Sequence, residues 1–407
     1  MSYYSVTKIH NDINKDHLKI KFNNMEETSD YINITIKNVL NKIKKKISLC
    51  GDDWNNIKKI TNPYEYIHTV VPNHKTSISK IKPLSRAFFK LIEICKIFHI
   101  FDNYSDKPIK TFHLAEGPGG FIEAVTYMRF NKYDKYYGMT LIDETNAEIP
   151  GWRKSEMFLQ KNPNVTIEAG SDNTGNLYNP KNFNYCLQKY QNSMDFITGD
   201  GGFDFSINYN SQETMASRLI FTQIMYAVGL QAEGGTFVLK VFDQFSKCSV
   251  DILYFLSTFY SKMYIFKPDT SRIANSERYI ICKNFKMPKN KNIYIKFEHI
   301  LTIFNNINFS DISLHRILNI NINNYFVKNI EEINAIIAQQ QVYNILTTLK
   351  IIQNKEKKCD KTNIIKNKNI KKCIQWCETH NIPYYKYGVS SNVFMSGKRN
   401  SNYFTNN

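Results

Sequence analysis

The chain has 407 residues, 42% of them hydrophobic and 14% aromatic, and a formal net charge of +17 at pH 7. This length predicts one large domain with additions, or two to three domains, and the charge favours a polyanionic partner such as nucleic acid. No apolar run is long enough to span a bilayer, and residues 1–12 lack the apolar segment of a signal peptide. We therefore expect a soluble intracellular protein that contacts no membrane.

The first 75 residues form a polar, mixed extension with some helical periodicity. Within it, "TNPYEYIHT" at 61–69 is typical of a turn. A stronger helix follows Pro83, where Ser85 is a candidate cap. Lys90 lies within this helix, whose apolar stripe consists of Phe88, Leu91, Ile92, Cys95 and Phe98.

From residue 109 onward, apolar strand-like runs alternate with helical segments. The expected strands lie at 109–116, 135–142, 193–200, 236–242, 262–268 and 277–285, with helices such as 211–235 between them. Strands that alternate with helices indicate βαβ units and a mostly parallel sheet.

The character of the chain changes after residue 287. The polar break "PKNKN" precedes residues 291–350, which look mostly helical. Residues 354–373 are basic and of low complexity, as in a linker or an exposed face, and the tail at 396–407 is expected to be disordered. We therefore divide the chain into an N-terminal extension (1–75), a core domain (76–288) and a basic, mostly helical C-terminal region (289–407).

Residues 113–125, "HLAEGPGGFIEAV", place a glycine loop between a predicted strand and a predicted helix. The loop matches neither a P-loop nor a clean G-x-G-x-x-G motif. Its glycines let a ligand approach bare backbone, and the following helix is expected to point free N–H groups at a carboxylate or phosphate. Asp143 follows the second strand and could bind ribose hydroxyls, which leaves a dinucleotide and S-adenosylmethionine both open.

Charged residues lie where further strands should end. Asp200 closes "DFITGD", Glu277 opens "ERYIIC", and Lys240 lies within the apolar run "TFVLKVF". A lysine in such a strand is costly to bury alone, and nearby carboxylates would relieve that cost. Structural salt bridges are one interpretation of this pattern, and a catalytic cluster that includes Lys90 is another.

Five segments in order, "SRAFFKL", "AEGPGGF", "GDGG", "FVLKVF" and "KPDTSR…NSERYIIC", resemble the FtsJ-type RNA 2′-O-methyltransferases. The resemblance covers residues 77–286. It implies a Rossmann-like class I methyltransferase, an α/β fold in which a seven-stranded, mostly parallel sheet carries helices on both faces. "GMTL", "GSDNTGNL", "GDGGFD", "KPDTSRIANSERY" and the segment at 61–69 are similar to the eukaryotic and viral (Adrift-type) branch that methylates mRNA caps.

The resemblance also implies a set of site residues. The family's Lys-Asp-Lys-Glu tetrad corresponds to Lys90, Asp200, Lys240 and Glu277. We expect Lys240 to act as the general base towards a ribose 2′-hydroxyl, the carboxylates to orient it, and Lys90 to be a second cation that positions the hydroxyl. The cofactor would be S-adenosylmethionine, bound by Glu116, Gly117, Gly119, Gly120, Phe121, Asp143 and Asp172.

The partner implied is RNA, in particular m7G-capped mRNA, with the first or second transcribed nucleotide as the target. Arg86 and Arg218 are candidate phosphate contacts, and capping or transcription machinery is a further candidate partner. Cys373, Cys377 and His380 do not have a common zinc spacing, so we expect no metal. The nucleus or cytoplasm would be the location, or a viral factory or virion if the source is viral.

The sequence leaves two alternatives open. One is 2′-O-methylation of ribosomal or transfer RNA by the same chemistry. The other is a non-catalytic, RNA-binding or polymerase-associated subunit with a methyltransferase fold, although a complete tetrad argues against an inert copy.

Overall fold

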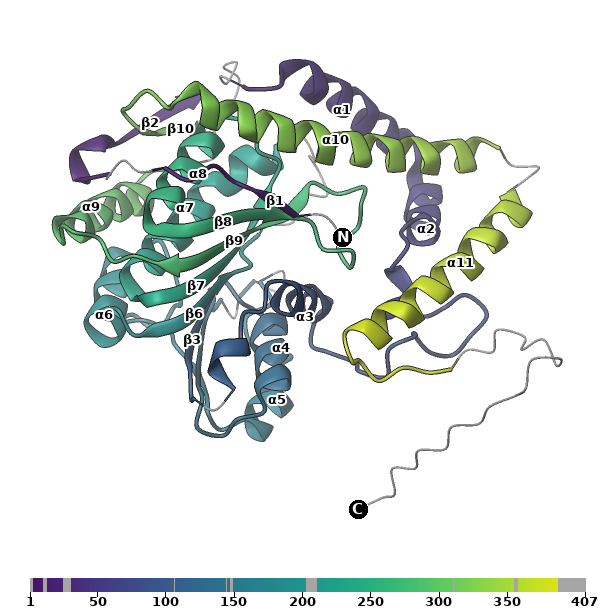
Figure 1. The fold of residues 1–407 in the computed structure, drawn as a ribbon, viewed down its shortest axis with the longest axis horizontal. Helices are drawn as coiled ribbons and strands as arrows, with labels where there is room; N and C mark the ends of the chain where they lie inside the picture. Colours follow the sequence, from purple (N-terminus) through teal and green to yellow (C-terminus); the bar gives the residue numbers. More distant parts are fainter. Residues whose placement is uncertain are drawn as a thin grey trace.

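The computed structural model describes most of the chain, whose course is shown in Figure 1. The described residues are 3–9, 13–24, 31–105, 107–143, 145–146, 149–202, 211–309, 312–354 and 358–386. The tail at 396–407, for which disorder was expected, lies outside the described residues. Within those ranges, no helix is long and apolar enough to cross a membrane.

A mixed sheet forms the centre of the fold, with the strand order β1-β8-β9-β7-β6-β3-β4-β5. Five neighbouring strands run parallel, as the alternation of strands and helices predicted. They are β3 (Lys110–Leu114), β4 (Lys135–Met139), β5 (Val165–Ile167), β6 (Met194–Gly199) and β7 (Gln231–Phe242).

The other side of the sheet is antiparallel. β9 (Glu277–Phe285) runs antiparallel to both β7 and β8 (Tyr260–Phe266). β1 (Tyr3–Ser5) pairs antiparallel with β8, so the described part of the chain has an eight-stranded sheet where seven strands were expected. The edge of β8 offers unpaired backbone groups that β1 satisfies, and a three-residue strand is too short to show a periodicity in sequence.

Helices cover both faces of the sheet, as predicted. One face carries α3 (Ala87–Ile97), α4 (Gly120–Arg129) and α5 (Glu156–Lys161). The opposite face carries α6 (Pro180–Tyr190), α7 (Gln212–Leu230), α8 (Lys247–Phe259) and α9 (Asn292–Asn306).

Successive residues of one strand enter the two different hydrophobic clusters. Phe196 in β6 packs with α3 and α4, whereas its neighbour Ile197 packs on the side of α7. Val238 and Leu239 in β7 divide in the same way. Because side chains of a strand alternate between faces, burial on both faces gives the continuous apolar runs that the sequence shows.

The two terminal regions pack against each other. α1 (Ile34–Ile47) and α2 (Gly51–Thr61) share a hydrophobic cluster with α10 (Asn324–Gln353). β2 (Leu18–Asn24) pairs antiparallel with β10 (Ile312–Leu318), a strand that the helical expectation for 291–350 missed. The boundaries proposed at 75/76 and 288/289 stay predictions.

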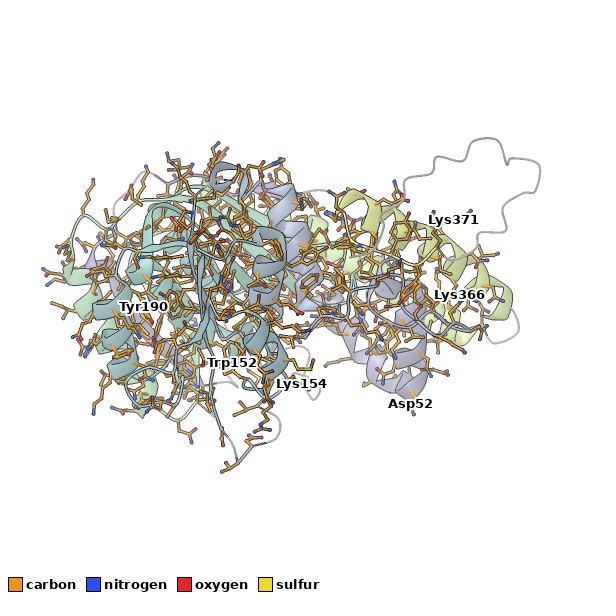
Figure 2. All side chains as sticks on the ribbon, turned by 90° about the horizontal axis from the view of Figure 1, so that it is seen from below. Asp52, Trp152, Lys154, Tyr190, Lys366 and Lys371 are labelled. Atoms are coloured by element: carbon orange, nitrogen blue, oxygen red, sulfur yellow. The ribbon has the colours of Figure 1, made fainter. Side chains whose placement is uncertain are left out.

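The basic segment 354–373 is mostly helical, so of the two interpretations, a linker or an exposed face, the linker is wrong. α11 (Lys358–Thr379) covers most of it, and Ile370, Cys373 and Trp376 bury an apolar stripe against the face that carries α3. In Figure 2, Asp52 of α2 and Lys366 and Lys371 of α11 lie in a lobe beside the sheet. Lysine-rich composition concealed this stripe in the sequence.

Candidate active site

The four residues of the predicted tetrad meet at one edge of the sheet. Asp200 directly follows β6, and Lys240 lies near the end of β7. Glu277 begins β9 opposite Phe242, because β9 runs antiparallel to β7 and starts where β7 ends. Lys90 reaches this edge from α3. The carboxyl ends of parallel strands are the usual place for a ligand in an open α/β sheet.

The tetrad consists of two ion pairs. Lys90 Nζ lies 2.7 Å from Glu277 Oε1, and the side chains are 7% and 12% exposed. Lys240 Nζ lies 3.3 Å from Asp200 Oδ1, with side chains 12% and 16% exposed. The near burial of all four groups makes their charges interact strongly, because little water screens them.

Tyr279 connects the two pairs. Its hydroxyl donates to Asp200 Oδ1 at 3.1 Å and makes a longer contact of 3.4 Å with Glu277 Oε1. Burial raises the pKa of Tyr279 well above its usual value, and the two carboxylates raise it further, so the hydroxyl keeps its proton. Sequence reasoning missed Tyr279, although residues i and i+2 of a strand share a face and Glu277 stands two positions before it.

The amine of Lys240 is held by more than its carboxylate partner. Lys240 Nζ donates to the backbone oxygen of Asp200 at 2.5 Å. A Cβ atom on Gly202 would stand 3.2 Å from this amine, so glycine keeps the approach to Nζ open. Asp200 therefore orients the amine of Lys240, and the absence of a side chain at Gly202 leaves space beside it.

The pKa values of Lys90 and Glu277 depend on burial and on the charge of the partner. Burial lowers the pKa of Lys90. The charge of Glu277 opposes this effect, but the pKa of Lys90 is still lowered overall. Burial raises the pKa of Glu277, but Lys90 and Lys240 outweigh it and hold the pKa well below its usual range. Glu277 is therefore an ionised carboxylate at neutral pH.

Residues of the loop before β9 hold Glu277 in place by hydrogen bonds. Ser271 Oγ donates to Glu277 Oε1 at 2.9 Å, and Lys267 Nζ donates to its backbone oxygen at 2.7 Å. Burial lowers the pKa of Lys267 to about 7. Both residues belong to the segment "KPDTSRIANSE". No spacing of residues in the sequence indicated that this segment positions Glu277.

The glycine loop lies beside this cluster, between β3 and α4. Gly119 has a φ of +106°, which strains any residue with a side chain. A Cβ atom on Gly117 would stand 2.6 Å from the backbone oxygen of Gly151, and one on Gly120 would overlap Ser85. Packing therefore requires glycine at 117 and 120, and backbone conformation requires it at 119. A cis peptide bond joins Gly117 to Pro118.

Glu116 corrects one expectation about this loop. Its Oε1 atom accepts hydrogen bonds from the backbone N–H groups of Phe121 (2.7 Å) and Ile122 (3.0 Å), so these N–H groups of α4 are occupied. Its Oε2 atom is buried with no hydrogen-bond partner among the described residues. Burial, together with the charge of Asp200, raises the pKa of Glu116 to about 8, against the opposing effect of the two backbone N–H groups. A donor group of a ligand could satisfy this oxygen.

The other cofactor candidates occupy the same edge in different ways. The ring of Phe121 is fully buried and packs 6.0 Å from that of Tyr279. Asp143, after β4, accepts three hydrogen bonds from Thr145 and Asn146 and closes its own turn. Asp172, after β5, binds Thr174, Asn179 and Asn182 through its carboxylate. Contact of these residues with a cofactor stays a prediction.

The two arginine candidates lie in different surroundings. Arg86 precedes α3, donates to the backbone oxygen of Thr270 at 3.4 Å, and has a buried Nε atom with no partner among the described residues. Arg218 stacks 4.0 Å from the rings of both Tyr178 and Phe309 and donates to Phe304 O. Its contacts hold α7 to neighbouring segments and do not include the tetrad.

Comparison with known proteins complements this geometry. The sequence matches the family described as FtsJ-like methyltransferase over residues 83–285. It is 28% identical over 275 residues to cap-specific mRNA (nucleoside-2′-O-)-methyltransferase 2 of Drosophila melanogaster, a match that covers 61% of this chain and 36% of that protein. It is 32% identical over 259 residues to cap-specific mRNA (nucleoside-2′-O-)-methyltransferase 1 of Homo sapiens, covering 59% and 29%.

The chain thus spans about a third of the length of these curated relatives. Among solved structures, a ribosomal RNA methyltransferase from Plasmodium falciparum is 21% identical, with a TM-score of 0.35, over 50% of this chain and 98% of that one.

Proposed function

Because residues 83–285 belong to the FtsJ-like methyltransferase family, whose members depend on S-adenosylmethionine, we propose that this protein is an mRNA cap ribose 2′-O-methyltransferase. The observation that carries the proposal is the pairing of Lys90 with Glu277 and of Lys240 with Asp200, beside a glycine loop and at the carboxyl edge of the sheet.

Lys240 is the proposed general base. A ribose 2′-hydroxyl is a poor nucleophile near neutral pH, so a base must take its proton as the new bond forms. Lys240 Nζ is the proposed acceptor of that proton, and Asp200 orients it through its backbone oxygen and its carboxylate. Asp200 and Glu277 then stabilise the ammonium that results.

Lys90 and Tyr279 are the proposed positioning groups. Lys90 pairs with Glu277 and can donate a hydrogen bond to the ribose oxygen. Tyr279 holds Asp200 and Glu277 in a fixed relation to each other. Fixing the acceptor oxygen in line with the methyl group supplies much of the remaining acceleration.

The residues after β3 fit the cofactor. S-adenosylmethionine, when bound, supplies a methyl group that is already activated as a sulfonium. The unpartnered Oε2 atom of Glu116 can accept a hydrogen bond from the donor's ammonium or ribose groups. The loop from Gly117 to Gly120 would follow the methionine part, and Asp143 and Asp172 would lie towards the ribose and adenine.

The choice of capped mRNA as the substrate is supported by two curated relatives whose names specify it. The test is to incubate the protein with labelled S-adenosylmethionine and a short RNA, in m7G-capped and uncapped forms, and to map the methylated nucleotide. We expect methylation of the first or second transcribed nucleotide, on the capped RNA only.

Equal activity on capped and uncapped RNA would contradict the cap assignment and favour ribosomal or transfer RNA. Transfer to neither RNA, by a protein that still binds RNA, would favour the non-catalytic subunit.

A further inference from the structure

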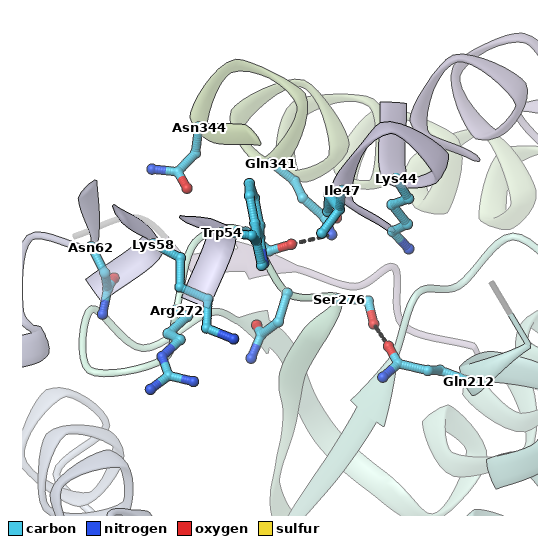
Figure 3. Close-up of a pocket in the computed structure, with 12 residues that line it drawn as sticks. Lys44, Ile47, Trp54, Lys58, Asn62, Gln212, Arg272, Ser276, Gln341 and Asn344 are labelled. Carbon is cyan, nitrogen blue, oxygen red and sulfur yellow. Dashed lines mark hydrogen bonds between the residues drawn. The ribbon is translucent and has the colours of Figure 1, made fainter. Parts of the chain in front are cut away.

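A cavity of about 210 Å³ lies next to the tetrad, where both terminal regions meet the loop before Glu277. α1 and α2 of the N-terminal region, α10 of the C-terminal region and residues 272–276 form its walls (Figure 3). Most of the residues that line it are polar or cationic by type, with Ile47, Trp54 and Ala274 as the apolar ones. The walls from α1, α2 and α10 lie outside the part of the chain that matches the methyltransferase family.

The cavity carries more positive than negative charge. Arg272 donates to Glu65 at 2.6 and 2.9 Å, and this carboxylate is fully buried. Lys58 lies beside Arg272 at the same side of the cavity, as Figure 3 shows, and its pKa is lowered by burial and by Arg272. Arg86 lies close enough to Glu65 and Arg272 for their charges to affect its pKa. Of the three cations near Glu65, Lys58 and Arg272 line the cavity.

One of these cations, Arg86, also lies near the tetrad. Arg86 lies close enough to both Arg272 and Glu277 for their charges to act on it, and its guanidinium donates to the backbone oxygen of Thr270 in the loop before Glu277. Its Nε atom has no partner among the described residues. Because an RNA backbone carries one negative charge for each nucleotide, a row of cations that begins at the reacting site suits a strand that runs through it.

Two amide groups add unsatisfied acceptors to the lining. The amide nitrogen of Gln341 donates to the backbone oxygen of Ala274 at 2.8 Å, and that of Asn62 donates to the carboxylate of Glu65. The amide oxygens of Gln341 and Asn62 have no hydrogen-bond partner among the described residues. Buried acceptors without partners cost free energy that a donor from a ligand would recover. Ribose hydroxyls and base N–H groups are such donors.

We propose that this cavity binds a phosphate of the RNA strand next to the nucleotide that is methylated, with Lys58 and Arg272 as its cationic contacts. The inference rests on the proposed function and adds to it a substrate subsite built by α2 and α10. The cavity is smaller than the roughly 300 Å³ at which pockets for drug-sized ligands begin, which favours one phosphate and its sugar over a whole dinucleotide.

Lys58 and its neighbour Lys59 allow a matched test. Both lie on α2 and carry the same charge, but Lys58 lines the cavity and Lys59 is exposed on another face. Binding of a fluorescein-labelled ten-nucleotide RNA is measured by anisotropy at several salt concentrations, with no methyl donor present. We expect Lys58→Gln to weaken binding about three- to tenfold and to reduce the slope of log Kd against log salt by about 0.7.

The control variant Lys59→Gln should bind as the wild type does. Lys58→Glu and Lys59→Glu repeat the comparison with charge reversal, and a thermal melt of each variant checks that it folds. Equal binding by the Lys58 and Lys59 variants would overturn the inference.

The two proposals fail in different ways. A wild-type protein that transfers no methyl group contradicts the proposed function, while the binding assay still decides the subsite because it needs no chemistry. A wild-type protein that methylates RNA, with Lys58 and Lys59 variants that bind RNA equally, contradicts the subsite alone.

Discussion

Trp376 Nε1 donates a hydrogen bond of 3.3 Å to Glu93 Oε2, which joins the C-terminal helix α11 to α3. Glu93 is fully buried and also accepts hydrogen bonds from the backbone N–H groups of Asp269 (2.6 Å) and Thr270 (3.1 Å). Those residues begin the loop whose later members hold Glu277. A helix outside the family match therefore contributes to the position of a tetrad residue.

Trp376→Phe tests this connection. The substitution keeps an aromatic ring in the core but removes the N–H donor, so Glu93 loses one hydrogen bond. We expect a loss of about 1–2 kcal/mol in the free energy of unfolding, measured in urea, and a several-fold lower kcat. Tyr384→Phe removes an exposed hydrogen bond near the same terminus and should change neither quantity. Identical behaviour of the two variants would argue against the connection.

Lys240→Met should separate chemistry from binding. The side chain keeps most of its volume but cannot accept a proton, so kcat for methyl transfer is expected to fall by about 10²- to 10⁴-fold. The Kd values for RNA and for S-adenosylmethionine should change by less than about threefold, as measured by anisotropy and calorimetry. Lys262→Met, at an exposed position of β8, is the matched control and should keep full activity.

Glu277→Gln breaks a buried ion pair and leaves the ammonium of Lys90 without its carboxylate. Removing one partner of such a pair typically costs about 3–5 kcal/mol, so we expect a lower unfolding free energy and a large loss of activity. The double variant Lys90→Met with Glu277→Gln removes both charges and should recover part of the stability. Its activity should stay lost, and recovery of activity would contradict a catalytic role for the pair.

Gly119→Val tests the glycine loop. At a φ of +106° a β-branched residue is strained, and its Cβ atom would stand 3.2 Å from Leu84. We expect the affinity for S-adenosylmethionine to fall at least tenfold, by calorimetry, while RNA affinity stays within about twofold. Gly234→Val is also strained, with a φ of +78°, but stands in open space and should leave donor affinity unchanged.

The parallel part of the sheet follows from local patterns, whereas the tetrad was predicted through the resemblance to FtsJ-type enzymes. Asp200 closes an apolar run, Lys240 lies near the end of another, and Glu277 opens a third on the antiparallel strand β9, so the three residues meet at one edge of the sheet. The contacts of Tyr279 and Glu93 with residues far away in the chain have no local signal. The same holds for Glu116, whose side chain occupies N–H groups of α4 that were expected to be free.

The sequence analysis also missed structure in both terminal regions of the chain, namely the buried stripe of α11 and the strand β1. The lysines of α11 concealed the apolar stripe of Ile370, Cys373 and Trp376, because the stripe is narrow and most other positions are polar. β1 is too short for a periodicity, and its pairing depends on an edge that only the folded sheet provides. These are interactions between distant segments, which the order of motifs along the chain does not contain.

Glu65→Gln gives a test that depends on pH. Burial raises the pKa of Glu65, but the two hydrogen bonds and the charge of Arg272 outweigh it and lower the pKa to about 2, from an ordinary value of 4.5. A carboxylate with a lowered pKa stabilises the fold above its ordinary pKa, and this contribution is lost as the pH falls towards the folded-state value. At pH 7 the wild type should exceed Glu65→Gln by about 3 kcal/mol in unfolding free energy.

That difference should shrink by about 1 kcal/mol between pH 5 and pH 3.5, because the wild type loses the contribution of Glu65 while the variant has none to lose. Urea unfolding at each pH measures it. Glu156→Gln, at an exposed position of α5, should match the wild type throughout. A difference that stays constant down to pH 3.5 would mean that Glu65 stabilises the fold by its shape and hydrogen bonds, and that its charge beside Arg272 contributes nothing.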